Sequence, residues 1–350
     1  MQEVGKTRKS SIELYRILLM IIIVAHHYVI NSGLYEKIMM DSIGVKQIFL
    51  LLFGWGGKTG INCFVLITGY FMCKSQISLK KFLKILLEVE FYTICIYLIF
   101  VLSGYASFSI KDFAKACVPL HGIGSGFTHS YLVFYLFIPF INILINNISK
   151  NMFQKLLYLS IIIFSVMPNM MLIGMTMNYI VWFVIIYLCG AYLRLYLDDK
   201  ISQKVWGIGM LLSLLASWTS VIIGAILSQK INKDITYFFV ADSNKILAIF
   251  TAITSFMFFK SLDIKHNKYI NIIAASTFGV FQIHANSNLM RTWLWNDVCK
   301  NNEVYSTGMI YIHSIVVVLL IYIVCTIIDI IRIRMVEKPV FMLYDKIVHK

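Results

Sequence analysis

Four ionisable residues lie within the first apolar stretch of the chain, residues 12–30. In the run IELYRILLMIIIVAHHYVI they are Glu13, Arg16, His26 and His27. Placing such groups inside a bilayer is energetically costly, so each is a candidate functional group by default. An arginine can bind an anion through charge-assisted hydrogen bonds, and a histidine can serve as a base or a nucleophile.

Arg16 and His27 are predicted to lie on one face of a helix. They are eleven residues apart, which corresponds to about 16 Å of rise and leaves their directions within about 20° of each other. His26 points about 80° away from Arg16. We therefore expect His27, rather than His26, to share a cavity with Arg16.

Each of these groups also has a simpler interpretation. Glu13 and Arg16 are three residues apart, a spacing that permits an ion pair at the cytoplasmic end of a span. His26 and His27 could equally be core residues that hydrogen-bond to neighbouring helices. This span alone leaves both interpretations open.

The composition of the chain indicates that its solvent is lipid. Of its 350 residues, 59% are hydrophobic and 14% are charged, and the mean hydropathy is +0.79, whereas soluble domains are roughly 45–50% apolar and about 25% charged. The net charge of +14 falls in short clusters between apolar stretches, so it reflects membrane topology rather than a nucleic-acid partner. The seven cysteines have no CxxC spacing, which argues against a metal site. A disulfide between Cys117 and Cys299 is less favoured than free thiols.

Ten stretches are long and apolar enough to cross a bilayer, because a span needs about 20 mainly apolar residues. We predict an all-α integral membrane protein of about ten transmembrane helices, built as a single polytopic domain over residues 1–350. The second stretch contains Gly54, Gly56, Gly57 and Lys58, so its entry is expected to be irregular and to lie at the outer surface. The predicted spans are 12–30, 48–73, 82–103, 130–148, 155–174, 179–197, 206–228, 245–262, 269–289 and 309–331.

The distribution of positive charge predicts that both termini are cytoplasmic. Of the 31 Lys and Arg residues, 20 fall in the segments that are inside when the amino terminus is inside, nine fall in outer segments, and Arg16 and Lys58 lie within spans. Short loops that carry such an excess face the cytoplasm. The first span has no small-residue cleavage site, so we expect it to be a retained helix rather than a signal peptide.

Three further ionisable residues are predicted to lie inside the membrane. His284 stands fifteen residues into the ninth span, at a depth close to that of His27, so the two histidines could face one site. A histidine that is bonded at the outer interface is an equally good alternative. Glu88 and Glu90 in the third span are unusual for lipid exposure, and we expect one of them to orient a basic group.

Several stretches of the chain resemble the membrane acyltransferase 3 family. The run IELYRILLMIIIVAHHY is similar to the first helix of that family, whose signature is an arginine, ten residues and a histidine. Arg16 and His27 match these two positions. The other similar stretches follow in order along nearly the whole chain: 60–72, with Thr68 where serine is usual, 131–142, 182–194, 276–291 and 336–341.

The resemblance implies O-acylation of bacterial surface polysaccharides, with acetyl-CoA or another acyl-CoA as the donor. The protein would be a multi-pass protein of the bacterial plasma membrane. Its partners would be acyl-CoA, a cell-envelope polysaccharide or lipid-linked glycan, and the bilayer, with no nucleic acid and no metal. Acetyl-CoA is made inside the cell and the acceptor hydroxyl lies outside, so the acyl group would have to cross the membrane.

The resemblance also assigns residues to the donor. Arg16, Lys81 and Lys84 are predicted to bind the phosphates of coenzyme A. The two lysines stand where the family usually has an arginine pair, and lysine cannot bind phosphate bidentately, so they could instead be anchors that only set topology. Thr68 is predicted to contact the donor by hydrogen-bonding the developing oxyanion, although threonine often bonds its own helix backbone.

The catalytic centre that the resemblance implies contains His27, Arg16 and His284. His27 would act as a general base on the sugar hydroxyl or would accept the acyl group itself, and the sequence does not choose between these routes. Membrane-interface belts explain most of the aromatic side chains, and for Tyr131, Tyr135 and Trp182, which match family positions, core packing is the favoured interpretation. The predicted substrate contacts are Tyr131, Tyr135, Trp182 and Asn286.

The alternative function is a polysaccharide flippase or polymerase, or another membrane transporter. Such proteins also have ten or more spans and a basic inner surface. The combination of Arg16 and His27 with cations at the inner face favours the acyltransferase, because a polymerase would more naturally place arginines in large outer loops. A non-catalytic scaffold would not need buried ionisable residues at all.

Overall fold

The computed structural model describes residues 8–118, 126–170, 178–197 and 200–348, and within them it contains helices and no β-strand. The predicted all-α class is confirmed for this part of the chain. The helices of the first half are α1 Ser10–Ile30, α2 Leu34–Met40, α3 Val45–Gly54, α4 Gly57–Met72, α5 Leu79–Leu102, α6 Ile110–Ala116, α7 Phe127–Asn147, α8 Lys150–Ile161, η1 Ile162–Val166 and η2 Met167–Asn169. Those of the second half are α9 Tyr179–Tyr192, η3 Leu193–Leu197, α10 Gln203–Ile231, α11 Ile246–Ser261, α12 Lys268–Ala275, α13 Thr277–His284, α14 Asn288–Thr292, η4 Trp293–Val298, α15 Asn301–Val304, α16 Ile310–Arg332, η5 Ile333–Glu337 and α17 Lys338–Val348.

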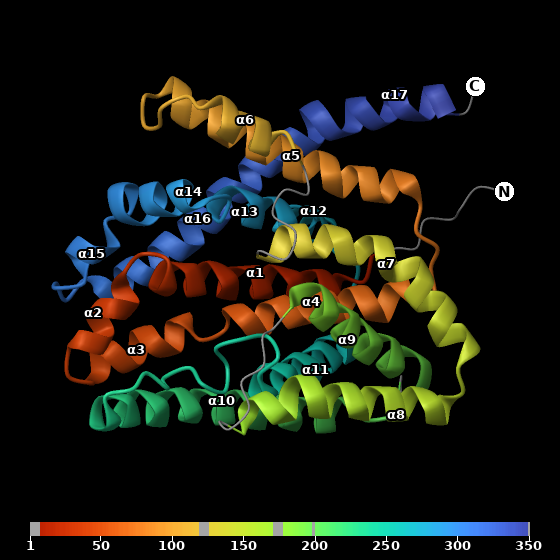
Figure 1. Ribbon diagram of the computed structural model, residues 1–350, viewed down its shortest axis with the longest axis horizontal. Helices are drawn as coiled ribbons and strands as arrows, with labels where there is room; N and C mark the ends of the chain where they lie inside the picture. The colour runs from red at the N-terminus through yellow and green to blue at the C-terminus, as the bar shows by residue number, and fades with distance from the viewer. Residues whose placement is uncertain (1–7, 119–125, 171–177, 198–199, 349–350) are drawn as a thin grey trace.

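Helix α1 runs through the middle of the bundle (Figure 1). It packs against α3, α4, α11, α12, α13 and α16. Of the most apolar 18-residue segment of α1, 56% is buried inside the protein, whereas the corresponding share for α5 is 17%. A helix enclosed in this way can present charged groups to the interior rather than to lipid. Arg16, His26 and His27 each bond a residue of another helix, and Glu13 pairs with Arg16 of α1 itself.

The apolar interior forms two clusters that meet along α1. One cluster joins side chains of α4, α7, α9 and α11, and the other joins side chains of α1, α3, α5, α13 and α16. The exposed side of α16 is a stripe of large aliphatic residues, as expected for a surface that faces lipid. This stripe includes Ile312, Ile315, Val316, Leu319, Leu320, Ile323, Val324, Ile327 and Ile331.

Eight helices of the described chain are long and apolar enough to cross a membrane, so the protein is a multi-pass membrane protein. They coincide with eight of the ten predicted spans. The predicted span 245–262 is the shorter helix α11, of 16 residues. The predicted span 269–289 is broken at Ser276 into α12 and α13, of eight residues each. The last residues of the predicted span 155–174 lie outside the described residues. A total of about ten spans and the cytoplasmic location of the termini remain predictions.

The second predicted span is interrupted, as its glycines led us to expect. Its break lies between α3 and α4, where Gly54, Gly56 and Gly57 are all buried. A Cβ at Gly54 would lie 2.8 Å from the Cβ of Val29, and one at Gly57 would lie 2.3 Å from the His26 ring. These glycines allow the chain to bend directly against α1, so the expected irregularity is present, and its location at the outer surface of the membrane remains a prediction.

The carboxyl-terminal helix continues far beyond the predicted tenth span. Helices α16, η5 and α17 form one apolar stretch of 39 residues, Ile310–Val348, which at about 1.5 Å per residue exceeds the roughly 30 Å hydrocarbon core. Its last part, α17, projects from one end of the bundle (Figure 1). There Lys80 pairs with Asp345 at 2.6 Å, which ties α17 to the start of α5.

Helices α4 and α9 cross with their backbones in direct contact. A Cβ at Gly190 would lie 2.5 Å from the carbonyl oxygen of Leu66, and one at Gly69 would lie 2.4 Å from that of Tyr187. Small residues of this kind allow membrane helices to approach closely. The contact holds the wall that contains Thr68 against the core of the bundle.

We expect Gly190→Ala to lower the thermal stability of the purified protein, because overpacking of this type costs about 1–3 kcal/mol. Helical circular dichroism in detergent, followed with temperature, measures the effect. Gly308→Ala is the matched control, since a Cβ there meets nothing within 4 Å. Equal melting temperatures for the two variants would show that the α4–α9 crossing is not close packed.

Candidate active site

A cavity of about 370 Å³ lies between α1, α4, α5, α7 and the α12–α13 segment. We call it the central cavity. Its wall is mostly apolar and has only a few polar groups, as is usual for sites that bind elongated organic ligands. The lining residues are Arg16, Met20, Ile23, Ile61, Phe64, Ile67, Thr68, Phe71, Met72, Ile85, Glu88, Phe127, Tyr131, Ala275, Phe278 and Phe281.

Helix α1 contributes a single stripe to the central cavity. Arg16, Met20 and Ile23 line it, and His27 follows one turn later in the same helical series. The His27 ring lies 6.0 Å from the ring of Phe281, a lining residue at this end of the cavity. Arg16 therefore stands toward one end of the cavity and His27 adjoins the other.

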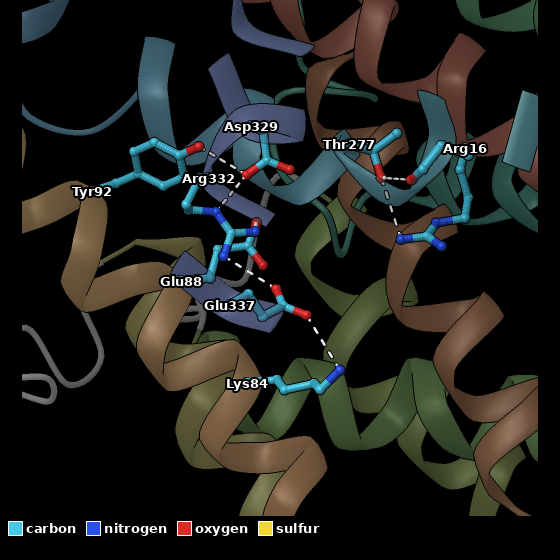
Figure 2. A network of polar contacts seen from close by, with 9 residues as sticks. Arg16, Lys84, Glu88, Tyr92, Thr277, Asp329, Arg332 and Glu337 are labelled. Atoms are coloured by element: carbon cyan, nitrogen blue, oxygen red, sulfur yellow. Dashed lines mark hydrogen bonds and ion pairs between the residues drawn. The ribbon is translucent and has the colours of Figure 1, made fainter. Parts of the chain in front are cut away.

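Arg16 is fixed by two polar neighbours. Its Nη1 donates to Oε2 of Glu13 at 3.2 Å, which confirms the predicted ion pair, and its Nη2 donates to Oγ1 of Thr277 at 3.3 Å (Figure 2). Thr277 is the first residue of α13, so the break of the ninth span at Ser276 places a hydroxyl at the guanidinium. The side chain is still 25% exposed, and a guanidinium has five N–H donors, so donors remain for an anionic ligand.

His27 and His284 are hydrogen-bonded to each other. Nδ1 of His27 lies 2.9 Å from Nε2 of His284, and Nδ1 of His284 lies 2.6 Å from the carbonyl oxygen of Val280. A carbonyl oxygen only accepts, so in the neutral ring His284 carries its proton on Nδ1 and accepts at Nε2. Nδ1 of His27 must then be the donor, and this assignment leaves its Nε2 as a lone pair. Both predicted histidines thus belong to one chain of hydrogen bonds.

His26 points away from this pair. Its Nδ1 lies 2.6 Å from the carbonyl oxygen of Gly54, and its ring packs on the backbone of Gly57. It lines a different pocket, on the other side of α1. The two consecutive histidines therefore face different surroundings, because neighbouring residues of a helix point about 100° apart.

Thr68 and Tyr131 face each other across the central cavity. Their hydroxyl groups are 3.1 Å apart, and the Thr68 hydroxyl also donates to the Phe64 carbonyl oxygen of its own helix at 3.0 Å. Thr68 therefore lines the central cavity, as its predicted contact with the donor requires, and it also makes the alternative hydrogen bond to its own helix backbone. The Thr68 proton is engaged with the backbone in one arrangement and available for a cavity ligand in another.

The other predicted substrate contacts do not line the central cavity in the described structure. Trp182 is buried and donates from Nε1 to Oδ1 of Asn62 at 2.9 Å. Tyr135 is buried against Phe82, and the Asn286 amide donates to the carbonyl oxygen of Gln282 in the preceding helix α13. For the two aromatic residues this is the packing role that the sequence favoured.

A buried ionic network adjoins the central cavity, and Arg332 is its centre (Figure 2). Arg332 is 3% exposed. Its Nε donates to Oδ1 of Asp329 at 2.7 Å, its Nη1 donates to Oε2 of Glu337 at 3.1 Å, and its Nη2 lies 3.4 Å from Oε1 of Glu88. The Tyr92 hydroxyl donates to Asp329 at 2.8 Å. Glu88 is the cavity-lining member of the network, and Arg332 is the basic group that it orients.

The predicted phosphate ligands Lys81 and Lys84 stand apart from the central cavity within the described residues. Lys84 pairs with Glu337 at 3.3 Å and lies over the Phe341 ring, so it joins α5 to the carboxyl-terminal segment.

The sequence places Arg332 among the cations of the inner loops and did not predict its burial. The available signal was the spacing of Asp329 and Arg332, which are three residues apart at the end of an apolar helix.

Two further pockets open at the Arg16 end of α1. The Arg8 pocket, of about 430 Å³, is lined by Arg8, Lys9, Ile12, Glu13, Arg16, Ile67 and Phe71, and it shares its last three residues with the central cavity. The basic pocket, of about 390 Å³, shares Ala275 with the central cavity. The basic pocket is lined by Arg8, His266, Lys268, Asn271, Ile272, Ala275, Ile330, Ile333, Arg334 and Lys338.

A family model described as an acyltransferase domain matches residues 9–330 of the chain. This range covers all the residues that line the central cavity. The chain belongs to the acyltransferase 3 family. No curated protein and no solved structure matches it.

The protein is therefore a membrane acyltransferase, and the alternative of a flippase or polymerase gains no support from the match. The described residues of the acyltransferase contain no group of three or more His, Cys, Asp or Glu that could hold a metal ion. All seven cysteines are free, so Cys117 and Cys299 are not joined.

We expect Arg332→Met to destabilise the acyltransferase strongly, by about 3–5 kcal/mol, because it leaves buried carboxylates without their cation. Thermal unfolding of the variant in lipid nanodiscs measures this. Lys80→Met, which removes a half-exposed partner of Asp345, is the control and should cost no more than about 1 kcal/mol. Similar small losses for both would mean that the network contributes little to folding.

Proposed function

We propose that this acyltransferase moves an acyl group, acetyl in the simplest case, from cytosolic acyl-CoA to a hydroxyl of a cell-surface or lipid-linked glycan. The observation that carries the proposal is a series of three neighbouring pockets that share lining residues. It begins at the basic and Arg8 pockets, passes Arg16 into the central cavity, and reaches Phe281 beside the bonded pair of His27 and His284.

The donor end suits coenzyme A in charge and shape. Phosphate groups require charge-assisted hydrogen bonds, and the basic pocket presents Arg8, Lys268, Arg334 and Lys338 together. Arg16 stands where the pocket region passes into the apolar cavity, which fits the extended pantetheine arm. We assign the phosphates to these residues and to Arg16. The originally expected Lys84 would then act indirectly, through its pair with Glu337.

The acceptor end suits a base-assisted transfer. His27 Nε2 removes the proton of a glycan hydroxyl, the oxygen forms a bond with the thioester carbonyl carbon, and the carbon–sulfur bond breaks. The thiolate of coenzyme A then takes the proton from His27. In the second route His27 Nε2 attacks the carbonyl itself and the thiolate leaves. The glycan oxygen later displaces the imidazole, and the hydroxyl proton passes to the thiolate. Both routes need the lone pair that the bond to His284 leaves on Nε2, and both release free coenzyme A.

The remaining groups would support this step. His284 would hold the ring of His27 in the reactive tautomer, in the manner of the orienting residue of a catalytic triad. Thr68, with Tyr131 beside it, would donate to the oxyanion that develops on the carbonyl oxygen. We further propose that the protein lies in a bacterial plasma membrane with both termini in the cytoplasm, which puts the basic pocket inside the cell.

We expect His27→Ala to abolish acylation of the surface glycan in cells, because general-base catalysis typically contributes about 10²–10⁴-fold. Proton NMR of O-acetyl signals in the purified glycan measures it, at equal protein abundance in the membrane. His313→Ala is the control, since His313 bonds Tyr28 instead of the catalytic pair. Undiminished acetylation by His27→Ala would defeat the assignment.

We expect the double variant Arg334→Gln, Lys338→Gln to bind coenzyme A at least about tenfold more weakly, since a hydrogen bond to a charged group is worth about 1.5–3 kcal/mol. Calorimetric titration of the protein in nanodiscs with coenzyme A and with 3′-dephospho-coenzyme A measures the loss. The exposed pair Lys155→Gln, Lys204→Gln is matched in charge and should leave affinity unchanged. Equal losses of coenzyme A affinity in the two double variants would mean that the effect comes from the overall charge of the protein and not from Arg334 and Lys338.

A further inference from the structure

A pocket of about 350 Å³ lies at the His26 end of α1, away from the basic pocket. We call it the tyrosine pocket. Its walls come from α1, the α3–α4 break, α2 and the segment between α10 and α11. The lining residues are His26, Ile30, Tyr35, Trp55, Lys58, Asp234, Ile235, Thr236, Tyr237, Phe238, Val240, Ala241 and Lys245.

Aromatic rings form much of the wall of the tyrosine pocket. Tyr35 and Tyr237 are stacked with centroids 5.5 Å apart, and Trp55 and Phe238 complete the aromatic set. Ring faces carry partial negative charge and attract the weakly positive C–H groups of another molecule. A pyranose ring presents such C–H groups on its faces and hydroxyl groups around its edge, so it matches a pocket that mixes aromatic faces with polar groups.

The charges of the tyrosine pocket are already balanced within the protein. Lys58 lies 3.5 Å from Asp242 and donates to the Tyr179 hydroxyl at 2.6 Å. Asp234 accepts from the Tyr35 hydroxyl at 2.7 Å, and Lys245 donates to the Pro168 carbonyl oxygen at 3.1 Å. The lining cations Lys58 and Lys245 are balanced by the lining carboxylate Asp234 and by Asp242, which pairs with Lys58 but does not itself line the pocket, so no net charge is left for a ligand to neutralise. This balance favours an uncharged ligand, in contrast to the unbalanced cations of the basic pocket.

His26 connects the tyrosine pocket to the catalytic pair. Because its Nδ1 is bonded to the Gly54 carbonyl oxygen, the neutral ring carries its proton there and its Nε2 is an acceptor. The rings of His26 and His27 are 5.7 Å apart. A hydroxyl group that donates to His26 would therefore lie on the face of α1 next to the one that carries His27.

We propose that the tyrosine pocket binds an uncharged pyranose residue of the acceptor glycan and that His26 is a positioning residue for its hydroxyl. The proposal rests on the proposed acyl transfer, which it deepens by assigning the acceptor site and the class of sugar. The sugar stacks on the tyrosine wall and hydrogen-bonds to Asp234 and His26. The donor and the acceptor then reach the catalytic pair from opposite ends of α1.

Saturation-transfer NMR tests the binding directly. The full-length protein in nanodiscs is mixed with methyl glycosides of glucose, galactose, mannose and N-acetylglucosamine, and with methyl glucuronide as the charged comparison. We expect saturation of at least one neutral glycoside and a loss of at least about tenfold in its affinity in Tyr35→Ala. Tyr105→Ala is the matched control, because Tyr105 is also half-exposed and also donates to an aspartate, Asp297. It should bind as the unchanged protein does.

Several results would overturn the proposal. They are binding of none of the neutral glycosides, preference for the glucuronide, or equal binding by Tyr35→Ala. Coenzyme A affinity reports whether each variant is folded. If Tyr35→Ala fails that check, Asp234→Leu removes a hydrogen-bond acceptor from the same wall and must weaken neutral glycoside binding instead.

The positioning role of His26 has its own measurement. We expect His26→Gln to raise the KM for the glycan roughly three- to tenfold, the worth of one hydrogen bond, and to leave coenzyme A affinity unchanged. A parallel loss of both would indicate a structural role. If the protein binds glycosides but the His27→Ala variant still acylates, the proposed function alone is refuted. If His27→Ala abolishes acylation but the protein binds no glycoside, the assignment of the tyrosine pocket alone is refuted.

Discussion

The cost of holding ionised groups in an apolar bundle constrains the whole structure. Arg332 is almost fully enclosed, and carboxylates from α5, α16 and η5 surround it. Glu88 of α5 is more than 200 residues away from Asp329 and Arg332 in the sequence, so their pairing fixes α5 against the end of α16. Removing any one of these charged groups leaves the others buried, without water, and without one of their partners.

The same network shapes the site. Asp329 lies so close to Gly279 that a Cβ there would be 2.2 Å from its carboxyl carbon, which seats α13 directly on α16. Helix α13 begins with Thr277, which holds Arg16, and ends with His284, which holds His27. One short helix thus contacts both ionisable groups of the α1 stripe. Its position depends on the buried charges beneath it, and Glu88 extends those charges to the cavity wall.

Much of this arrangement follows from the local sequence pattern, and part of it does not. Helical periodicity alone places Arg16 and His27 on one stripe, and depth counting brings His284 to the level of His27. The Glu13–Arg16 pair follows from their spacing. Hydropathy could not reveal the break at Ser276, because both halves of that span are apolar. Nor could it show that Arg332 is buried, since a cation at the end of a span looks the same whether it meets water or the carboxylates of a distant helix.

The break between α3 and α4 separates two kinds of structure. The central cavity is lined mainly by the long helices α1, α4, α5 and α7, together with the α12–α13 segment. The tyrosine pocket takes much of its wall from α2 and the short segment 234–241, which lie outside those helices. On the proposed assignment of the two pockets, exchange of these few residues would alter which sugar is accepted without disturbing how the thioester is held. A single helical scaffold could in this way diversify over many envelope chemistries while its interior stayed the same.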